Sequence, residues 1–200
     1  LQTTLPGDLD VSAAVRYDEY DQEGDVGAQV VGGKFDNVAP QLGIAWRATD
    51  SLLLRASWGE SFRAPNMGEM FSSQALSFET AVDTLWCDQP GNSDPVYCDQ
   101  SGTQHKTWFG GNPDLQPEEG ESLTAGLVYN ITDDWSAELS YYDVTLDNKI
   151  AAISVARLLA EERENGVGSN PAVVRDPNTG QIDTMYSFDQ NMASLETSGF

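Results

Sequence analysis

The chain has 200 residues and a formal net charge of −22, from 10 Lys and Arg against 32 Asp and Glu. So large an acidic excess repels phosphate and argues against nucleic acid as a partner. Hydrophobic residues make up 40% of the chain and aromatic residues 10%, which argues against an intrinsically disordered protein. No run approaches the roughly 18 apolar residues of a transmembrane helix.

Six segments alternate apolar and polar side chains with the period of a β-strand. In chain order they are residues 8–18, 39–48, 52–59, 122–131, 135–144 and, more weakly, 191–200. In the third segment one face is apolar: Leu52, Leu54, Ala56 and Trp58. The other face is mostly polar or small: Leu53, Arg55, Ser57 and Gly59. Such a strand fits a sheet between an apolar and a polar environment.

The connections between these segments are of two kinds. Thr49-Asp50 and residues 132–134 form tight turns, whereas residues 19–33, residues 62–120 and the segment after the fifth strand are long. Because tight and long connections alternate, the long ones all fall on one rim. Outer-membrane β-barrels have this asymmetry, so the sequence predicts an all-β fold: an antiparallel transmembrane β-barrel fragment of about six strands with one short loop helix.

Aromatic side chains of the apolar face gather near both ends of the strands, as in the two aromatic belts of a membrane barrel, about 25 Å apart. They are Trp46, Tyr129 and Trp135 beside the tight turns, and Tyr17, Trp58 and Tyr141 beside the long connections. The residues expected to face outer-membrane lipid are Leu42, Ile44, Trp46, Leu52, Leu54, Trp58, Leu127, Tyr129, Trp135, Leu139 and Tyr141. Arg55 and Ser57 are expected to face a polar interior. The alternative is that the aromatic residues form the core of a soluble sandwich.

The long connections carry local structure of their own. Residues 151–165 have Ile153, Ala156, Leu159 and Ala160 at helical spacing and precede Gly166, which predicts a short helix. Residues 173–186 predict a hairpin that turns at residues 176–180.

Cys87 and Cys98 stand in a segment rich in turn-forming residues, without a cluster of His or further Cys that would indicate zinc. A local disulfide in an oxidising compartment is the preferred interpretation, and two free thiols are the alternative.

No catalytic constellation, cofactor motif or metal site is evident, and we expect no enzyme. His105, the only histidine, is expected to be a solvated loop residue. The acidic run of residues 18–25 could supply oxygen ligands to Ca²⁺, but it lacks EF-hand spacing and is interpreted as a solvated tip. Four loop aromatic residues could contact a ligand or form the loop's own core: Trp86, Tyr97, Trp108 and Phe109.

Several stretches resemble the TonB-dependent outer-membrane receptors: "SFRAP" (residues 61–65), "GNPDLQPEEGES" (residues 111–122) and "SYYDVTLDNKI" (residues 140–150). The resemblance implies a 22-stranded barrel closed by an N-terminal plug. It also implies uptake of scarce nutrients, most often ferric siderophores, driven by the TonB complex. All of residues 1–200 would belong to the barrel domain, incomplete at both ends, with the plug and the TonB box outside them.

The resemblance implies a place in the outer membrane of a Gram-negative bacterium, with lipid, a nutrient such as a ferric siderophore and the TonB complex as partners. The main alternative is a passive outer-membrane porin or adhesin without energy coupling. A soluble secreted sandwich is the third hypothesis.

Overall fold

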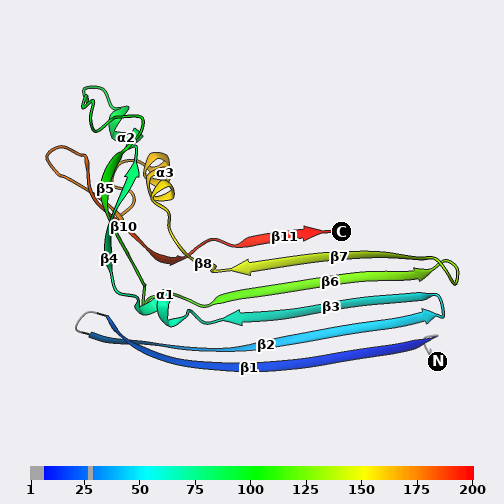
Figure 1. Ribbon diagram of the computed structural model, residues 1–200. Coiled ribbons are helices and arrows are strands. Elements are labelled where there is room, and N and C mark those ends of the chain that lie inside the picture. Colours follow the sequence, from blue (N-terminus) through cyan, green and yellow to red (C-terminus); the bar gives the residue numbers. More distant parts are fainter. Residues whose placement is uncertain (1–6, 27–28) are drawn as a thin grey trace.

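The computed structural model describes residues 7–26 and 29–200. Its main element is an antiparallel sheet of six strands in the order β1-β2-β3-β6-β7-β11 (Figure 1). The strands are β1 (Asp8–Val26), β2 (Gln29–Thr49), β3 (Leu52–Arg63), β6 (Glu118–Asn130), β7 (Ser136–Asp147) and β11 (Leu195–Gly199). The prediction of an antiparallel all-β fold is confirmed.

A second, smaller sheet has the order β4-β5-β10-β8, with β9 paired to β10. Its strands are β4 (Ala75–Ala81), β5 (Thr103–Gly110), β8 (Ile150–Ala152), β9 (Val173–Arg175) and β10 (Ile182–Asn191). The helices are α1 (Met67–Phe71), α2 (Thr84–Cys87) and α3 (Val155–Asn165). We call the small sheet with α2 and α3 the loop domain. It stands at the end of the large sheet opposite the two tight turns (Figure 1).

The pairing register of β3 brings like side chains together across the large sheet. Leu54 lies opposite Trp46 of β2 and Leu127 of β6, whereas Arg55 lies opposite Ala45 and Gly126. Directly paired residues share a face of the sheet, so the apolar sets predicted from separate segments form one continuous apolar face. This face is exposed: the exposed fraction is 54% for Leu42, 45% for Ile44, 54% for Leu139 and 72% for Trp135.

The predicted long connection at residues 19–33 is wrong. β1 and β2 continue as one hairpin until Val26 pairs with Gln29. The apolar alternation ends before the strands do, because charged side chains occupy this part of the hairpin. Lys34 Nζ, for example, pairs with Asp21 Oδ2 across the strands at 2.8 Å. Backbone pairing here runs beyond the hydrophobic pattern that revealed the strand.

The predicted helix is present but shorter than residues 151–165, because residues 150–152 form strand β8. Ser154 caps its N-terminus, accepting a hydrogen bond from the Arg157 backbone N–H at 3.3 Å. It ends at Gly166, which has a φ of 100° that suits glycine. The buried helix residues are Leu158 and Glu162. Of the predicted set, Ile153 is buried just before the helix and Leu159 packs against the same core, whereas Ala156 and Ala160 are exposed.

Leu158 belongs to the core of the loop domain, with Ile153, Val173, Ile182 and Met185. The predicted hairpin is confirmed, since β9 and β10 pair in antiparallel fashion around residues 176–180. Asp176 Oδ1 accepts hydrogen bonds from the backbone N–H groups of Asn178 at 2.7 Å and Thr179 at 3.0 Å, which fixes this turn.

Arg63, at the end of β3, fastens the loop domain's base to the large sheet. Its Nε lies 2.7 Å from Glu118 Oε2 at the start of β6, and its Nη1 lies 3.0 Å from Glu69 Oε2 on α1. The other carboxylate oxygen of Glu118 accepts the Ile150 backbone N–H of β8 at 2.7 Å. The Arg63 guanidinium therefore links the end of β3 and the start of β6 to α1 and, through Glu118, to β8.

Asn191 makes a second fastening at the same rim. Its Oδ1 accepts the Gln116 backbone N–H at 2.8 Å, and its Nδ2 donates to the Gln116 carbonyl at 2.7 Å. Asn112 Nδ2 donates to the Asp189 carbonyl at 3.0 Å. The "SFRAP" and "GNPDLQPEEGES" stretches thus have a structural explanation, because their side chains join the loop domain to the sheet.

Arg63→Gln is expected to loosen this junction without disturbing the large sheet. The Arg63 side chain is 43% exposed, so the loss of its ion pairs should cost only about 1 kcal/mol. Hydrogen exchange in the full-length protein should become faster at Ile150 and α1, and stay unchanged in the middle of β3. Arg16→Gln, which removes an exposed ion pair with Asp18, is the control and should leave exchange at Ile150 unchanged. Unchanged exchange at Ile150 in Arg63→Gln as well would contradict the proposed fastening.

Candidate ligand-binding surface

The loop domain is built from two connections that are far apart in the sequence. Residues 64–117 supply β4 and β5, and residues 148–194 supply β8, β9, β10 and α3. The two meet where β5 and β10 pair in parallel, with Trp108 opposite Tyr186. The face of the small sheet that carries Trp108 and Tyr186 therefore combines side chains of both connections. The loop domain stands at one rim of the large sheet (Figure 1).

A buried ion network joins the same two connections. Arg175 on β9 contacts Asp83, which precedes α2, and Glu162 on α3, with shortest nitrogen–oxygen distances of 2.7 Å to each. The exposed fraction of the three side chains is only 8%, 1% and 0% in that order. Burial opposes ionisation of Asp83, but hydrogen bonds from Arg175 and Tyr97 outweigh it and lower the pKa of this carboxyl group. The single positive charge of Arg175 thus faces the two carboxylate groups of Asp83 and Glu162.

Two of the aromatic residues predicted to contact ligand pack around this network. Tyr97 Oη donates to Asp83 Oδ2 at 2.8 Å and accepts the Ile182 backbone N–H at 2.8 Å. Burial, together with the Asp83 carboxylate, raises the pKa of the Tyr97 hydroxyl. Trp86 Nε1 donates to the Thr179 carbonyl at 2.8 Å, and the Trp86 and Tyr97 rings meet edge to face with centroids 5.1 Å apart. Both rings therefore have partners inside the loop domain.

The predicted disulfide between Cys87 and Cys98 is present. It closes the segment that carries Trp86 and Tyr97, and so holds both rings beside the buried network. In the chain-entropy model, closing a loop of this size contributes about 3 kcal/mol to loop order.

The expectation that His105 is a solvated loop residue is wrong. Its exposed fraction is 4%, and its ring lies against the Tyr97 ring with centroids 5.6 Å apart. Burial lowers the pKa of the imidazole. The Nε2 atom is 3.1 Å from Thr103 Oγ1. The position on β5, facing the core with Thr107, explains the burial, and a strand was not expected at this point of the chain.

Trp108 and Phe109 lie on opposite faces of the small sheet. Phe109 is on the side of the buried Thr107, opposite Ala75 and Ser187. Trp108 belongs to the other face of the small sheet, which we call the open face. Its large apolar side chains are Leu76, Phe78, Trp108, Tyr186 and Phe188, and Lys106 shares the same face. Leu76 and Phe78 are 46% and 55% exposed, and the Tyr186 and Phe188 rings are in contact. The four predicted ligand residues thus occupy three different surroundings.

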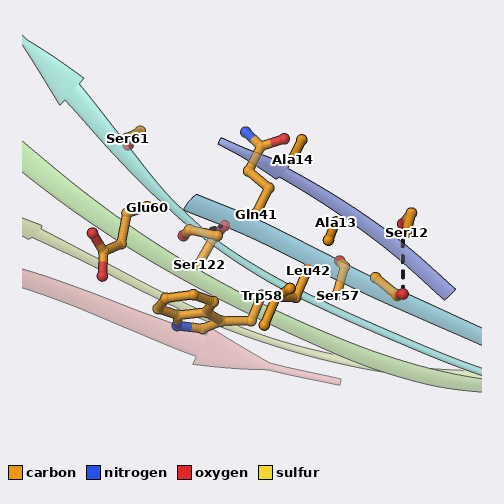
Figure 2. Close-up of a pocket in the computed structure, with 12 residues that line it drawn as sticks. Ser12, Ala13, Ala14, Gln41, Leu42, Ser57, Trp58, Glu60, Ser61 and Ser122 are labelled. Carbon is orange, nitrogen blue, oxygen red and sulfur yellow. Dashed lines mark hydrogen bonds between the residues drawn. The ribbon is translucent and has the colours of Figure 1, made fainter. Parts of the chain in front are cut away.

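The polar face of the large sheet, on the side of Arg55 and Ser57, has a shallow hollow of about 320 Å³ (Figure 2). Its lining is mostly small, and the Gln41 and Trp58 side chains point to opposite sides of the strands (Figure 2). Ser57 Oγ lies 2.6 Å from Thr124 Oγ1, and Arg55 forms an ion pair with Glu138 on this face. Polar side chains of this face therefore bind one another, and the hollow lies over them.

No helix within residues 7–26 and 29–200 is long and apolar enough to cross a membrane. Among the same residues no cluster of three or more His, Cys, Asp or Glu side chains is placed to hold a metal ion. In the acidic run of residues 18–25, Asp18 pairs with Arg16 and Asp21 with Lys34.

Comparison with known proteins identifies relatives of this sheet and loop arrangement. The family model described as "TonB dependent receptor-like, beta-barrel" matches residues 1–188. Heme/hemopexin utilization protein C of Haemophilus influenzae is 30% identical over 138 residues, which are 66% of this chain and 16% of that protein. The hemin receptor of Yersinia pestis is 28% identical over 152 residues, 72% of this chain and 19% of that protein. The chain spans less than a fifth of the length of either relative.

Solved structures agree on the fold. The ferric enterobactin receptor PfeA of Pseudomonas aeruginosa has a TM-score of 0.54 at 16% identity, over 98% of this chain and 22% of that one. A double mutant of the Serratia marcescens hemophore receptor HasR, in complex with its hemophore HasA and heme, has a TM-score of 0.53 at 17% identity, over 96% of this chain and 28% of that one. At these identities the likeness concerns the fold alone.

Arg175→Met is expected to destabilise the loop domain by about 3–5 kcal/mol, because it leaves Asp83 and Glu162 buried without a cation. In the full-length protein, amide hydrogen exchange should become faster in β5 and β10, while the large sheet keeps its wild-type exchange. The matched control is Lys106→Gln, which removes a cation of the same sheet whose ion pair with Asp183 is exposed and 4.0 Å long. Equal exchange rates of β10 in the two variants would show that the buried network does not hold the connections together.

Proposed function

The chain belongs to the TonB-dependent receptor β-barrel family, and from this premise we propose that it forms part of the wall and outer loops of a receptor for an iron-containing compound. The proposal rests on the difference between the two faces and between the two ends of the large sheet. This sheet has an exposed apolar face, a polar face, and a loop domain at one rim only. That is the arrangement of a barrel wall between lipid and a wet interior. Its place would be the outer membrane of a Gram-negative bacterium.

The apolar face is proposed to contact outer-membrane lipid through the eleven residues named from the sequence. Aromatic side chains near the loop domain support a water boundary there. Tyr17, Trp58 and Tyr141 each donate a hydrogen bond to a carboxylate, on Glu19, Glu121 and Asp143 respectively. Such side chains, apolar in the ring and polar at the tip, suit the interface between lipid and water.

The cargo is proposed to be heme, because the named relatives are heme/hemopexin utilization and hemin receptor proteins. A ferric siderophore, expected from the family resemblance, stays a prediction that the same measurements test. Uptake would be energised by the TonB complex through a plug domain that these residues do not include. Binding and release would be conformational steps, so the protein is not proposed to be an enzyme.

First contact with cargo is proposed for Trp108, on the open face of the small sheet. Phe109, the other residue of the predicted pair, lies on the opposite face and is proposed to support the strand that carries Trp108. A ring on the open face can stack on a planar ligand, and each such contact contributes about 0.5–1.5 kcal/mol. Trp86 and Tyr97 were the other candidates. Their hydrogen bonds within the loop domain favour an indirect role, in which they shape the loops that carry Trp108.

Leu54→Arg is expected to cost about 2–4 kcal/mol of folding free energy in bilayers, because it would place a charge in lipid near the midplane. Arg55→Ser removes the ion pair with Glu138, whose two side chains are 52% and 53% exposed, and should cost less than about 1 kcal/mol. Folding of the full-length barrel into vesicles, titrated with urea, measures both values. Equal tolerance at the two positions would contradict the assigned faces.

Cells that depend on the full-length receptor for iron should grow on hemin, and purified receptor should bind it. Replacing Trp108 with Ala should weaken hemin binding about 2- to 12-fold, by the loss of one ring contact. Replacing Phe109 as well should remove no second stacking contact, because that ring lies on the other face. Trp135→Ala, an aromatic change beside a tight turn at the other rim, is the control and should bind like the wild type. Growth on a ferric siderophore but not on hemin would show that the cargo is a siderophore rather than heme. Growth on neither would refute the proposed function.

A further inference from the structure

A hollow of about 480 Å³ lies where the loop domain joins the large sheet. It is bounded by the start of α3 and by the segment that connects β10 to β11. Its lining includes Lys149, Ile153, Arg157, Glu161, Met192 and Leu195. It is distinct from the open face that carries Trp108, since none of the open-face residues lines it.

Strand pairing places this hollow on the polar side of the large sheet. Leu195 lies opposite Leu146 of β7, Leu146 opposite Gly120 of β6, and Gly120 opposite Ser61 of β3. Ser61 is an even number of residues from Arg55, so it shares the polar face with Arg55. At Leu195 the hollow therefore borders the side that the proposed function assigns to the interior of the barrel.

The floor of the hollow is apolar. Ile153 is 4% exposed and belongs to the core of the loop domain, so it forms a fixed base. Leu195 is 51% exposed, although its side chain lies on the polar side of the sheet. With Met192 and Ala151, these side chains offer an apolar surface to a molecule that enters from the interior.

The rim of the hollow is positively charged in a strongly negative chain. Lys149 forms no ion pair within 4 Å among the described residues. Arg157 uses Nε to bind Glu161 Oε1 at 2.8 Å, and no hydrogen bond of the described residues involves its Nη groups. Two cations against one lining carboxylate give a net charge of +1 here, where the whole chain carries −22. Glu118, the nearby carboxylate that interacts with Lys149, is already held by Arg63.

We propose that this hollow is a second cargo subsite, which binds an iron chelate with an apolar body and carboxylate groups at one edge. The apolar body lies on Ile153, Met192 and Leu195, and the carboxylates pair with Lys149 and the Nη groups of Arg157. The subsite rests on the proposed uptake function and deepens it. It lies inward of Trp108 and selects cargo by its carboxylates.

The test measures binding of hemin and of hemin dimethyl ester to the purified full-length receptor. Hemin carries two carboxylates, and the ester masks both while keeping the ring and the iron. Wild-type receptor should bind hemin about tenfold more tightly than the ester, which is the usual size of a charge-assisted contact. In the double variant Lys149→Gln, Arg157→Gln this preference should vanish, because the groups that recognise the carboxylates are gone.

Two further variants control for charge and folding. Lys149→Arg keeps the cation and should keep the preference for hemin. Arg163→Gln removes another α3 cation, which lines a different hollow, and should also keep it. If the double variant still prefers hemin to the ester, the proposed subsite is wrong, whereas the proposed uptake function is unaffected. Displacement of hemin by palmitate would also overturn it, since the site would then be a lipid site. Failure of the wild type to bind any iron chelate would instead refute the proposed function.

Discussion

The register of β3 against β2 and β6 determines which face of the large sheet each side chain occupies. Because side chains alternate, a slip of one residue would exchange the positions of Leu54 and Arg55 throughout the sheet. One tight turn fixes the register of β3 against β2, and the other fixes the register of β6 against β7. Thr49 Oγ1 accepts hydrogen bonds from the backbone N–H groups of Ser51 and Leu52, and Thr132 Oγ1 does the same for Asp134 and Trp135. The separation of an apolar from a polar face depends on these small contacts.

Much of the large sheet could be predicted from the sequence because its determinants are local. A period of two, a tight turn and an apolar face are all visible within ten or twenty residues. The hairpin of β1 and β2 was predicted too short, since its outer half pairs charged residues such as Asp21 and Lys34 and shows no apolar alternation. The local disulfide between Cys87 and Cys98 was predictable for the same reason, because both cysteines lie in one turn-rich segment.

The helix α3 and the β9–β10 hairpin could be predicted locally, but the assembly of the loop domain could not, because its determinants are non-local. β5 and β10 pair across a long sequence separation, and Arg175 finds Asp83 on the other connection. Nothing near Arg175 in the sequence indicates that partner. The burial of His105 follows from the same pairing, which turns an apparent loop residue toward a core. Of the aromatic residues that pointed to a ligand surface, Trp86 and Tyr97 serve first to hold the connections together.

The mixed origin of the small sheet limits how such a protein can diversify. β10 uses one edge for β5 of the first connection and the other for β9 and β8 of the second. If residues 64–117 alone were exchanged with those of a related protein, β10 would lose its partner strand and Arg175 would lose Asp83. The two connections must therefore be inherited, or grafted in engineering, as a pair. Open-face side chains such as Trp108 take part in neither of these contacts, so each can be changed by itself without removing β5 or Asp83 from its partner.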